Sequence, residues 1–186
     1  ITAACYSLPQ AKALSAAAVQ AGGTVDIHLK ADTGMGRIGF PLRTDFAQSI
    51  AEMLEVCALP GLHMTGLFQH FAVADDDSTE NIAYTEEQYQ LFLRTYRALK
   101  AAGHEPPLVH CDNSAGVMLH PDWPNGEITA PCMARPGIIL YGFDPSDEVR
   151  FDTFEPVMKL KTVVSMVKEL QPGQSTSYGR RFTAKT

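Results

Sequence analysis

The sequence predicts an α/β protein: a partial (β/α) barrel of the TIM type with about five βα units, followed by the start of a β domain. Up to about residue 143, short strand-like segments alternate with helix-like ones, which is typical of a parallel sheet covered by helices. The polar residues Lys30, His70 and Asn113 recur where strand-like segments end, and in a βα barrel the chemistry lies at that end. A full barrel takes about 250 residues, so the barrel expected here is incomplete.

The strands and helices are predicted from the spacing of apolar residues. Short apolar or alternating runs predict strands at residues 1–5, 24–30, 62–68, 108–111 and 137–141. Helices are predicted between them, at residues 7–21, 44–57 and 85–103. Ser7 and Pro9 begin the first helix, and Thr85 with Gln88 forms a capping box for the third.

The sequence changes in character after Asp144. Residues 157–170 alternate apolar and polar residues without a helical period, Pro172-Gly173 predicts a turn, and residues 175–183 begin another extended segment. We therefore expect three parts: a partial βα barrel at residues 1–143, a linker at 144–156, and the beginning of a C-terminal β domain at 157–186.

The composition excludes several classes of protein. The chain has 186 residues and 45% of them are hydrophobic, so it is not a disordered or collagen-like chain. A net charge of −6 gives no general attraction to phosphate backbones, and we expect no nucleic-acid partner. Since no apolar run approaches the roughly 20 residues that cross a bilayer, we expect no membrane partner.

The cysteines and the chain ends bear on cellular location. The four cysteines are scattered without a CxxC pair, which favours a reducing compartment, and we expect a cytoplasmic protein. No signal-peptide pattern is visible. The chain starts at Ile1 rather than Met and stops abruptly after Thr186, so we expect it to be an internal piece of a longer polypeptide.

One glycine motif has the letters of a nucleotide-binding loop. Residues Gly34 to Gly39 spell GxGxxG after a predicted strand, but the dinucleotide loop also needs a helix that opens inside the glycines. Pro41 disfavours helix just before it, and Glu55, at about the distance of the acidic partner, lies inside a predicted helix. We interpret the motif as a tight loop that needs glycine for backbone reasons.

Metal ligands are not indicated by spacing. The six histidines include no HExxH or HxH pattern, so we predict no metal site. His28 lies on an apolar strand and is interpreted as a core or loop histidine. The acidic run at residues 75–77 is most simply a solvated loop, with calcium binding as the alternative.

Two short segments contain groups that suit a bound anion. Asn113-Ser114-Ala115-Gly116 follows a predicted strand and offers a hydroxyl and backbone N–H groups, as phosphate-binding barrel loops do. Arg135-Pro136-Gly137-Ile138 enters the last predicted strand. Each segment alone is weak evidence for an anion site. The first kind of segment is usually a loop and helix cap, and a lone arginine before proline usually forms a surface ion pair.

Five segments in order resemble the alanine racemase family. They are residues 30–39 (KADTGMGRIG), His70-Phe71-Ala72, Asn113-Ser114-Ala115, Ala134 to Ile138 with Tyr141-Gly142, and Ser177-Tyr178-Gly179. The resemblance covers nearly the whole chain and implies a pyridoxal-phosphate-dependent enzyme, a βα barrel followed by a β domain, that acts on a small amino acid as a head-to-tail homodimer. It also implies that the first barrel strands and most of the β domain are missing here.

The resemblance assigns roles around the cofactor. Arg135 would point at the pyridine nitrogen, which a guanidinium with a pKa above about 12 leaves unprotonated, and His70 would orient Arg135. The resemblance places the phosphate against four residues: Asn113, Ser114, and the backbone of Gly137 and Ile138. The alternative is that Gly137 and Ile138 only pack within a strand and do not contact the phosphate.

Arg37 and Lys30 are assigned to the substrate side. Arg37 would contact the phenolic oxygen of the cofactor or the carboxylate of the substrate. Lys30 resembles the lysine that is carbamylated in many family members. A neutral, partly desolvated amine can add carbon dioxide, and the resulting anion can pair with Arg37. The alternative for Lys30 is an ordinary ion pair with Asp32.

Tyr178 would be one of two acid/base residues, reaching the active site of the partner subunit. Racemisation removes a proton from one face of Cα and returns it on the other, so two groups must flank the reacting carbon. The second is the Schiff-base lysine, which the resemblance places on the first barrel strand, in a segment absent here. A tyrosine in Ser-Tyr-Gly is otherwise most often an aromatic residue of a β-turn.

The expected function is the interconversion of L- and D-alanine, which supplies D-alanine for cell-wall precursors. We expect this chain alone to be inactive because it lacks the lysine segment, and unpaired sheet edges lead us to expect a homodimer or other homo-oligomer. The alternatives are a racemase for another small amino acid such as serine, and an inert folded fragment that keeps a phosphate-binding corner. Amino-acid decarboxylation is disfavoured, because those enzymes typically place an acidic group at the position of Arg135.

Overall fold

A parallel β-sheet organises the first part of the chain. The computed structural model describes residues 1–123, 126–151 and 153–185. The strands stand in the order β1-β2-β4-β5, every neighbouring pair is parallel, and β3 pairs with the end of β2. Their bounds are Ala3–Cys5 (β1), Val25–Asp32 (β2), Phe40–Pro41 (β3), Leu62–Phe68 (β4) and Val109–His110 (β5). A parallel bridge from Val109 to Cys132 continues the sheet beyond β5.

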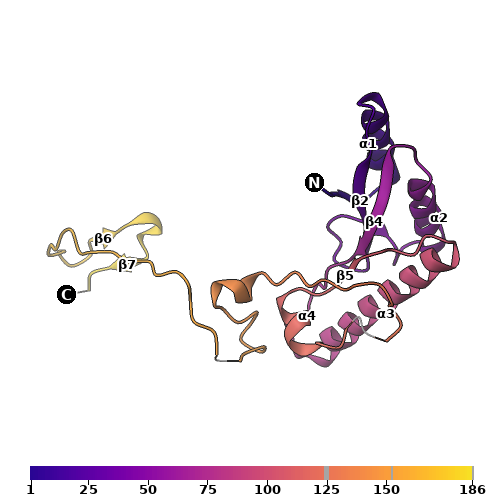
Figure 1. Cartoon of the computed structure of the whole chain (residues 1–186). Helices are drawn as coiled ribbons and strands as arrows, with labels where there is room; N and C mark the ends of the chain where they lie inside the picture. Colours follow the sequence, from indigo (N-terminus) through magenta and orange to yellow (C-terminus); the bar gives the residue numbers. More distant parts are fainter. Residues whose placement is uncertain (124–125, 152, 186) are drawn as a thin grey trace.

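Helices connect the strands and cover one face of the sheet (Figure 1). The side chains of Ser7, Asp45 and Ser78 each accept a hydrogen bond from a backbone N–H of the first turn, which satisfies donors that a helix start leaves unpaired. The helices are Leu8–Gln20 (α1), Phe46–Cys57 (α2), Thr79–Ala101 (α3) and Ser114–Leu119 (α4). The predicted α/β fold, a partial TIM-type barrel, is therefore confirmed.

The two faces of the sheet differ in chemistry. Along β2, Ile27 and Leu29 are fully buried in the apolar core between sheet and helices. Because side chains alternate along a strand, His28 and Lys30 point to the opposite face. On that face Lys30 lies 5.4 Å from the Phe68 ring of β4. The face of the sheet away from the helices thus carries His28 and Lys30 beside the Phe68 ring.

The start of α3 corrects one sequence prediction. The helix begins at Thr79, not at a capping box of Thr85 and Gln88. Ser78 provides the cap, since its hydroxyl accepts from the N–H of Asn81. Thr85 is instead a buried residue of the second turn, 3% exposed. Three residues after Ser78 stands Asn81, not the Glu or Gln that defines a capping box. Thr85 with Gln88 does match that pattern, which is why the prediction placed the helix start too far along the chain.

The predicted strand at residues 137–141 is also wrong. The structure has a short 3₁₀-helix there, η1, at Ile138–Tyr141. Leu140 N–H donates to Gly137 O and Gly142 N–H to Ile139 O, and Gly142 ends the turn with a left-handed φ of 79°. The place beside β5 is taken by the bridge at Cys132, so this apolar run has no neighbouring strand with which to pair.

Residues 145–149 still contact the barrel, through Ser146 and the buried Val149, and beyond residue 157 the chain extends away from the sheet (Figure 1). The run at residues 157–170, where we expect the β domain to begin, is not part of any strand, and Val157 N–H donates to Tyr141 O at its start. An extended segment becomes a strand only when it pairs, so among the described residues the run is extended but unpaired beyond this contact. The turn at Pro172-Gly173 is confirmed, and a small antiparallel pair follows, β6 at Ser175–Thr176 and β7 at Phe182–Thr183, separated by the 3₁₀-helix η2 at Tyr178–Arg180. The division into domains stays a prediction.

Candidate active site

The ends of neighbouring strands meet at one edge of the sheet. Lys30 lies near the end of β2, His70 follows β4, and His110 ends β5. Arg135 follows the bridge at Cys132, where its N–H donates to Asp112 O. Because all these strands are parallel, their carboxyl ends lie on the same side. This edge is where the sequence predicted the chemistry.

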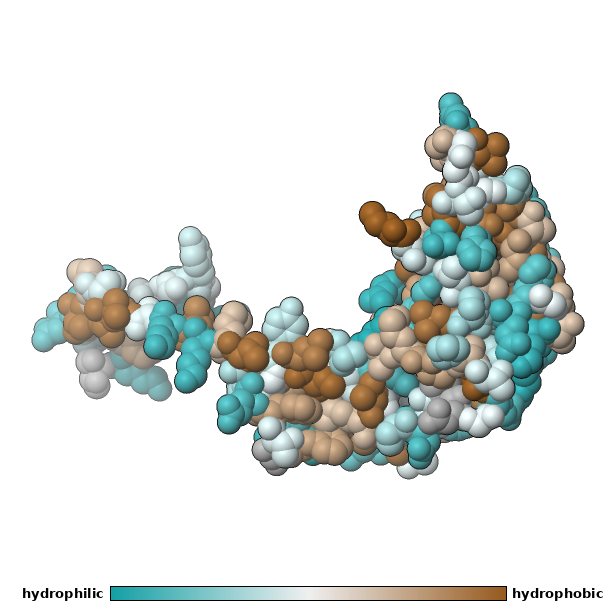
Figure 2. Space-filling model, in the orientation of Figure 1, coloured by the Kyte–Doolittle hydropathy of each residue, from teal (hydrophilic) through white to brown (hydrophobic). Residues whose placement is uncertain are grey.

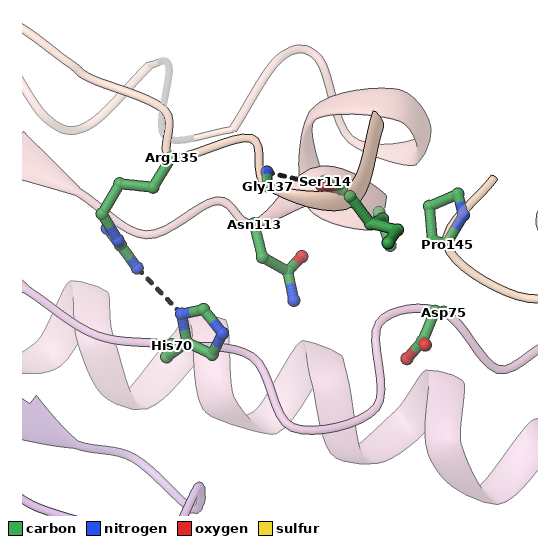
Figure 3. Close-up of a pocket in the computed structure, with 9 residues that line it drawn as sticks. His70, Asp75, Asn113, Ser114, Arg135, Gly137 and Pro145 are labelled. Atoms are coloured by element: carbon green, nitrogen blue, oxygen red, sulfur yellow. Dashed lines mark hydrogen bonds between the residues drawn. The ribbon is translucent and has the colours of Figure 1, made fainter. Parts of the chain in front are cut away.

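A cavity of about 220 Å³ opens at this edge (Figure 3). It contains six of the predicted site residues, which come from three different connections after strands. The lining residues are His70, Asp75, Asn113, Ser114, Ala115, Arg135, Gly137, Ile138 and Pro145. The structure therefore brings together the residues to which the sequence assigned cofactor contacts, apart from Arg37.

Arg135 is held in place by four contacts. Its Nη1 lies 2.5 Å from His110 Nδ1 and donates to the backbone oxygen of His110 at 3.1 Å. Its Nη2 donates to the backbone oxygen of Gln69 at 2.6 Å and lies 3.1 Å from His70 Nδ1. The predicted contact of His70 with Arg135 is therefore present (Figure 3). A guanidinium with both amino groups anchored keeps one orientation.

The arginine also fixes the protonation of two histidines. A guanidinium only donates, so the nitrogens of His110 and His70 that face Arg135 must be unprotonated acceptors. Burial, followed by the charge of Arg135, lowers the pKa of His110 to about 3 and that of His70 to about 4. Both rings are thus neutral near pH 7.

A third histidine extends this contact. His110 accepts at Nδ1, so its proton lies on Nε2, 2.9 Å from His28 Nδ1. His28 Nδ1 is then an acceptor, and burial lowers the pKa of this ring. Sequence interpretation missed His110 as a partner of Arg135 and treated His28 as a core or loop histidine. One feature of the sequence could have indicated them: His110 and His28 lie on predicted strands, and the other site residues lie at the ends of such strands.

The opposite end of the cavity holds hydroxyl and backbone groups (Figure 3). Gly137 N–H donates to Ser114 Oγ at 2.8 Å. Asn113 lines the cavity, but its side chain is already engaged, accepting from Gly116 N–H at 3.0 Å and donating to Phe71 O at 3.4 Å. Ile138 is 45% exposed, so strand packing does not account for it.

Lys30 is buried beside this site. It is 2% exposed, and its Nζ donates to Ala31 O at 2.9 Å. Burial lowers its pKa to about 8; Asp32 opposes the shift, and the charges of Arg135 and Arg37 add to it. Lys30 and Asp32 form no ion pair among those found in the described residues, and Asp32 Oδ1 instead accepts from two backbone N–H groups of the following loop.

Two predicted residues lie outside the cavity. Arg37 is exposed on the glycine loop after β2, and its charge still contributes to the lowered pKa of Lys30 and His70. That loop leads into β3 with no helix between the glycines, in agreement with its interpretation as a tight loop. Tyr178 is 98% exposed and belongs to the segment that extends away from the sheet (Figure 1). Its role across a subunit boundary stays a prediction.

The described part of the chain shows neither a cluster of metal ligands nor a membrane-spanning helix. Within it, no group of three or more His, Cys, Asp or Glu side chains is arranged to hold a metal ion. None of its helices combines the length and apolar character required to cross a membrane.

Comparison with known proteins decides the family. The family model described as "Alanine racemase, N-terminal domain" matches residues 1–145. The chain belongs to the alanine racemase family. A curated alanine racemase from Desulforamulus reducens is 38% identical over 185 residues, which cover 98% of this chain and 47% of that protein. The chain thus spans about half the length of the curated relatives that it matches.

Solved structures of the same family share the fold. The alanine racemase of Clostridium difficile 630 is 35% identical, with a TM-score of 0.74 over 100% of this chain and 46% of that one. The alanine racemase of Streptomyces coelicolor A3(2) is 29% identical, with a TM-score of 0.79 over 100% of this chain and 47% of that one. The partial barrel found here therefore corresponds to part of each of these alanine racemases.

Proposed function

We propose that this chain forms the cofactor-binding side of an alanine racemase, an isomerase that interconverts L- and D-alanine with pyridoxal phosphate. The observation that carries the proposal is the cavity in which Arg135, fixed by two neutral histidines, faces Ser114 and Gly137 at the other end. Membership of the alanine racemase family supports it. D-alanine made in this way would serve cell-wall precursor synthesis, and the four free cysteines favour the cytoplasm.

The residues present fit pyridoxal phosphate. A phosphate needs hydrogen-bond donors, and the Ser114 hydroxyl accepts from Gly137 N–H, so its own proton is free to donate into the cavity. We assign Ser114 and the backbone of Gly137 and Ile138 to the phosphate, with Asn113 holding their loop. Gly137 N–H, which donates to Ser114 Oγ here, would turn from that hydroxyl to the phosphate.

Arg135 would act on the other end of the cofactor. When bound, pyridoxal phosphate supplies an electron sink for the charge left when a proton leaves Cα. A guanidinium keeps its proton at any working pH, so Arg135 would leave the ring nitrogen bare and keep the sink weak. A weak sink favours return of the proton to Cα over side reactions such as transamination. His70 and His110 maintain this arrangement because they accept from Arg135 without carrying a charge.

Proton transfer needs residues on both faces of Cα. We propose Tyr178 as one acid/base group, contributed to the site of a partner subunit in a homodimer, with Arg37 binding the substrate carboxylate or the phenolic oxygen of the cofactor. The second base would be a lysine on a strand that is not among these 186 residues. We therefore propose that this chain by itself binds the cofactor but does not turn over alanine.

Cofactor titration tests the proposal. We expect saturable binding of pyridoxal phosphate by the chain, weaker binding of pyridoxal, which lacks the phosphate, and weaker phosphate-dependent binding after Ser114→Ala. Ser15→Ala serves as a matched control, since the hydroxyl of Ser15 donates to Pro60 O and lies outside the cavity lining. Equal binding of the two compounds would contradict the phosphate assignment, and clear racemisation of alanine by this chain would contradict its proposed inactivity.

A further inference from the structure

Gln88 of α3 is a fully buried polar residue that the proposed mechanism does not use. Its exposed fraction is 0%. Glutamine is mostly a surface residue, and an amide inside a core is normally held by hydrogen bonds. The sequence placed Gln88 in a helix cap, but α3 begins at Thr79, so the polar atoms of Gln88 serve another purpose.

The amide of Gln88 bonds to the segment that follows β4. Its Oε1 accepts from Ala72 N–H at 2.9 Å, and its Nε2 donates to His70 O at 3.2 Å. Nε2 also donates to Thr33 Oγ1 at 3.1 Å. A side-chain amide has two N–H donors and one oxygen, so both of its polar atoms are engaged. These bonds fix the backbone of residues 70–72 relative to α3.

Thr33 extends this contact to Gln69. Thr33 lies just after β2 and is 1% exposed, and its hydroxyl donates to Gln69 Oε1 at 2.5 Å. Gln69 is fully buried, and its Nε2 has no hydrogen-bond partner among the described residues. Within that part of the chain, the side chain of Gln69 is therefore held through Thr33, which in turn accepts from Gln88.

The segment held in this way supplies two of the four contacts of Arg135. Arg135 Nη2 donates to Gln69 O at 2.6 Å and lies 3.1 Å from His70 Nδ1. Gln88 thus supports both acceptors of this amino group. The other amino group, Nη1, contacts His110 instead, to which Gln88 makes no hydrogen bond among the described residues. The two amino groups of the guanidinium therefore differ in their dependence on Gln88.

We propose that Gln88 is a positioning residue, which fixes residues 69–72 so that they present two acceptors to Arg135. The acceptors are Gln69 O and His70 Nδ1. Gln88 does not line the cofactor cavity and acts only through this segment. The consequence for the cofactor rests on the proposed function, whereas the positioning itself can be measured without any cofactor.

The histidine rings provide the measurement. Ring ¹⁵N spectra of the chain without cofactor report which nitrogen is protonated and whether it is hydrogen-bonded. In the parent chain we expect His70 and His110 each to keep an unprotonated Nδ1 bonded to Arg135. Gln88→Met keeps the side-chain length but loses all three bonds. We expect His70 to lose its bond in this variant and to populate both neutral tautomers, while His110 is unchanged.

Three further variants separate positioning from general stability. Thr33→Val removes the hydroxyl that joins Gln88 to Gln69, so we expect a partial change at the His70 ring. Thr33→Ser keeps the hydroxyl and should restore the parent spectrum. Leu99→Ala is the control on the same helix, because Leu99 is fully buried and its truncation destabilises the core without removing a bond to residues 69–72. It should leave the His70 ring unchanged.

Cofactor binding measures the consequence at the ring nitrogen. We expect Gln88→Met to bind pyridoxal phosphate about tenfold more weakly, the effect of weakening one hydrogen bond to a charged group. An analogue with carbon in place of the ring nitrogen offers nothing for Arg135 to bond. Its affinity should therefore be the same for the parent chain and for Gln88→Met.

An unchanged His70 ring in a folded Gln88→Met chain would overturn the proposal. An equal change in Leu99→Ala would do so too, because loss of core packing alone would then loosen the arginine. If Gln88→Met does not fold, Thr33→Val decides, and an unchanged His70 ring in that variant would be the contrary result. Failure of the parent chain to bind pyridoxal phosphate, with the ring spectra as expected, would count against the proposed function alone.

Discussion

Arg135 shows how single side chains acquire a function from their surroundings. The family motif predicted the arginine and His70, because both lie in short sequences specific to the family. The acceptor His110 and its partner His28 were not predicted, since each is one histidine on an apolar strand with no spacing signal. Only the parallel pairing of β2, β4 and β5 places the two rings next to each other, and the His110 ring next to the guanidinium. Residues that meet across a sheet are far apart in the sequence, so no local sequence pattern reveals their contact.

Lys30 leads to a prediction about pH and stability. Because its pKa falls from the ordinary value of 10.5 to about 8, the unfolded chain binds more protons than the folded chain between those two pH values. Stability therefore rises with pH across this window, and the cost of the buried charge is fully present below pH 8. We expect Lys30→Met to raise the free energy of unfolding by about 2 kcal/mol at pH 7.

The measurement is urea unfolding of both chains from pH 6 to pH 11. The advantage of Lys30→Met should shrink above pH 8 and disappear near the unfolded pKa. Lys12→Met is the control, because Lys12 is exposed and pairs with Glu55 on the surface. A constant difference between Lys30→Met and the parent chain at every pH would show that the buried charge is not the cause. Saturation with bicarbonate tests the predicted carbamylation separately, through a carbamate signal that Lys30→Met should lack.

At the scale of elements, the strand positions were the most predictable feature. The strand at Leu62–Phe68 matches its prediction residue for residue, and β2 extends its prediction by two residues at the carboxyl end. These strands have apolar partners on both sides in the sheet. The runs at 137–141 and 157–170 have similar composition but no neighbouring strand, and they did not become strands. Composition predicts the tendency to extend, whereas pairing decides whether a strand forms.

The glycine loop after β2 gives the prediction that belongs to this scale. Gly39 has a φ of 129°, and a Cβ there would lie 2.8 Å from both Asp32 N and Lys30 O. Those are backbone atoms of β2, so they cannot move without disturbing the strand that positions Lys30. We expect Gly39→Ala to lower the free energy of unfolding by more than about 3 kcal/mol.

Gly36 in the same loop is the matched control. Its φ of 66° is also left-handed, but a Cβ there would meet nothing within 4 Å. Gly36→Ala should therefore cost only about 1 kcal/mol. Thermal and urea unfolding of the two variants measure the difference. Equal losses would show that the close approach to β2 is not what requires glycine at position 39.

At the scale of the whole molecule, the C-terminal segment is the part whose apolar side chains have the least packing around them. Apolar side chains stand in solvent along it (Figure 2), with exposed fractions from 69% at Val157 to 99% at Leu160. The others are Met158, Val163, Val164, Met166 and Val167. Contiguous apolar surface of this kind marks a site of interaction in soluble proteins. The proposed homodimer, with Tyr178 reaching a partner subunit, would require this same segment to lie against another copy.

We therefore expect the chain to self-associate through residues 157–167. Replacing Leu160 and Val164, which are 99% and 80% exposed, by lysine should remove apolar contact area and add like charges to both copies, and so shift the chain toward monomer. Val19→Lys, an equally polar change at a 54% exposed position on α1, should leave association unchanged. Sedimentation velocity across a range of concentrations measures the outcome. If the double lysine variant associates as strongly as the parent, the contact lies elsewhere, and the unpaired edge of β1 becomes the surface through which the copies meet.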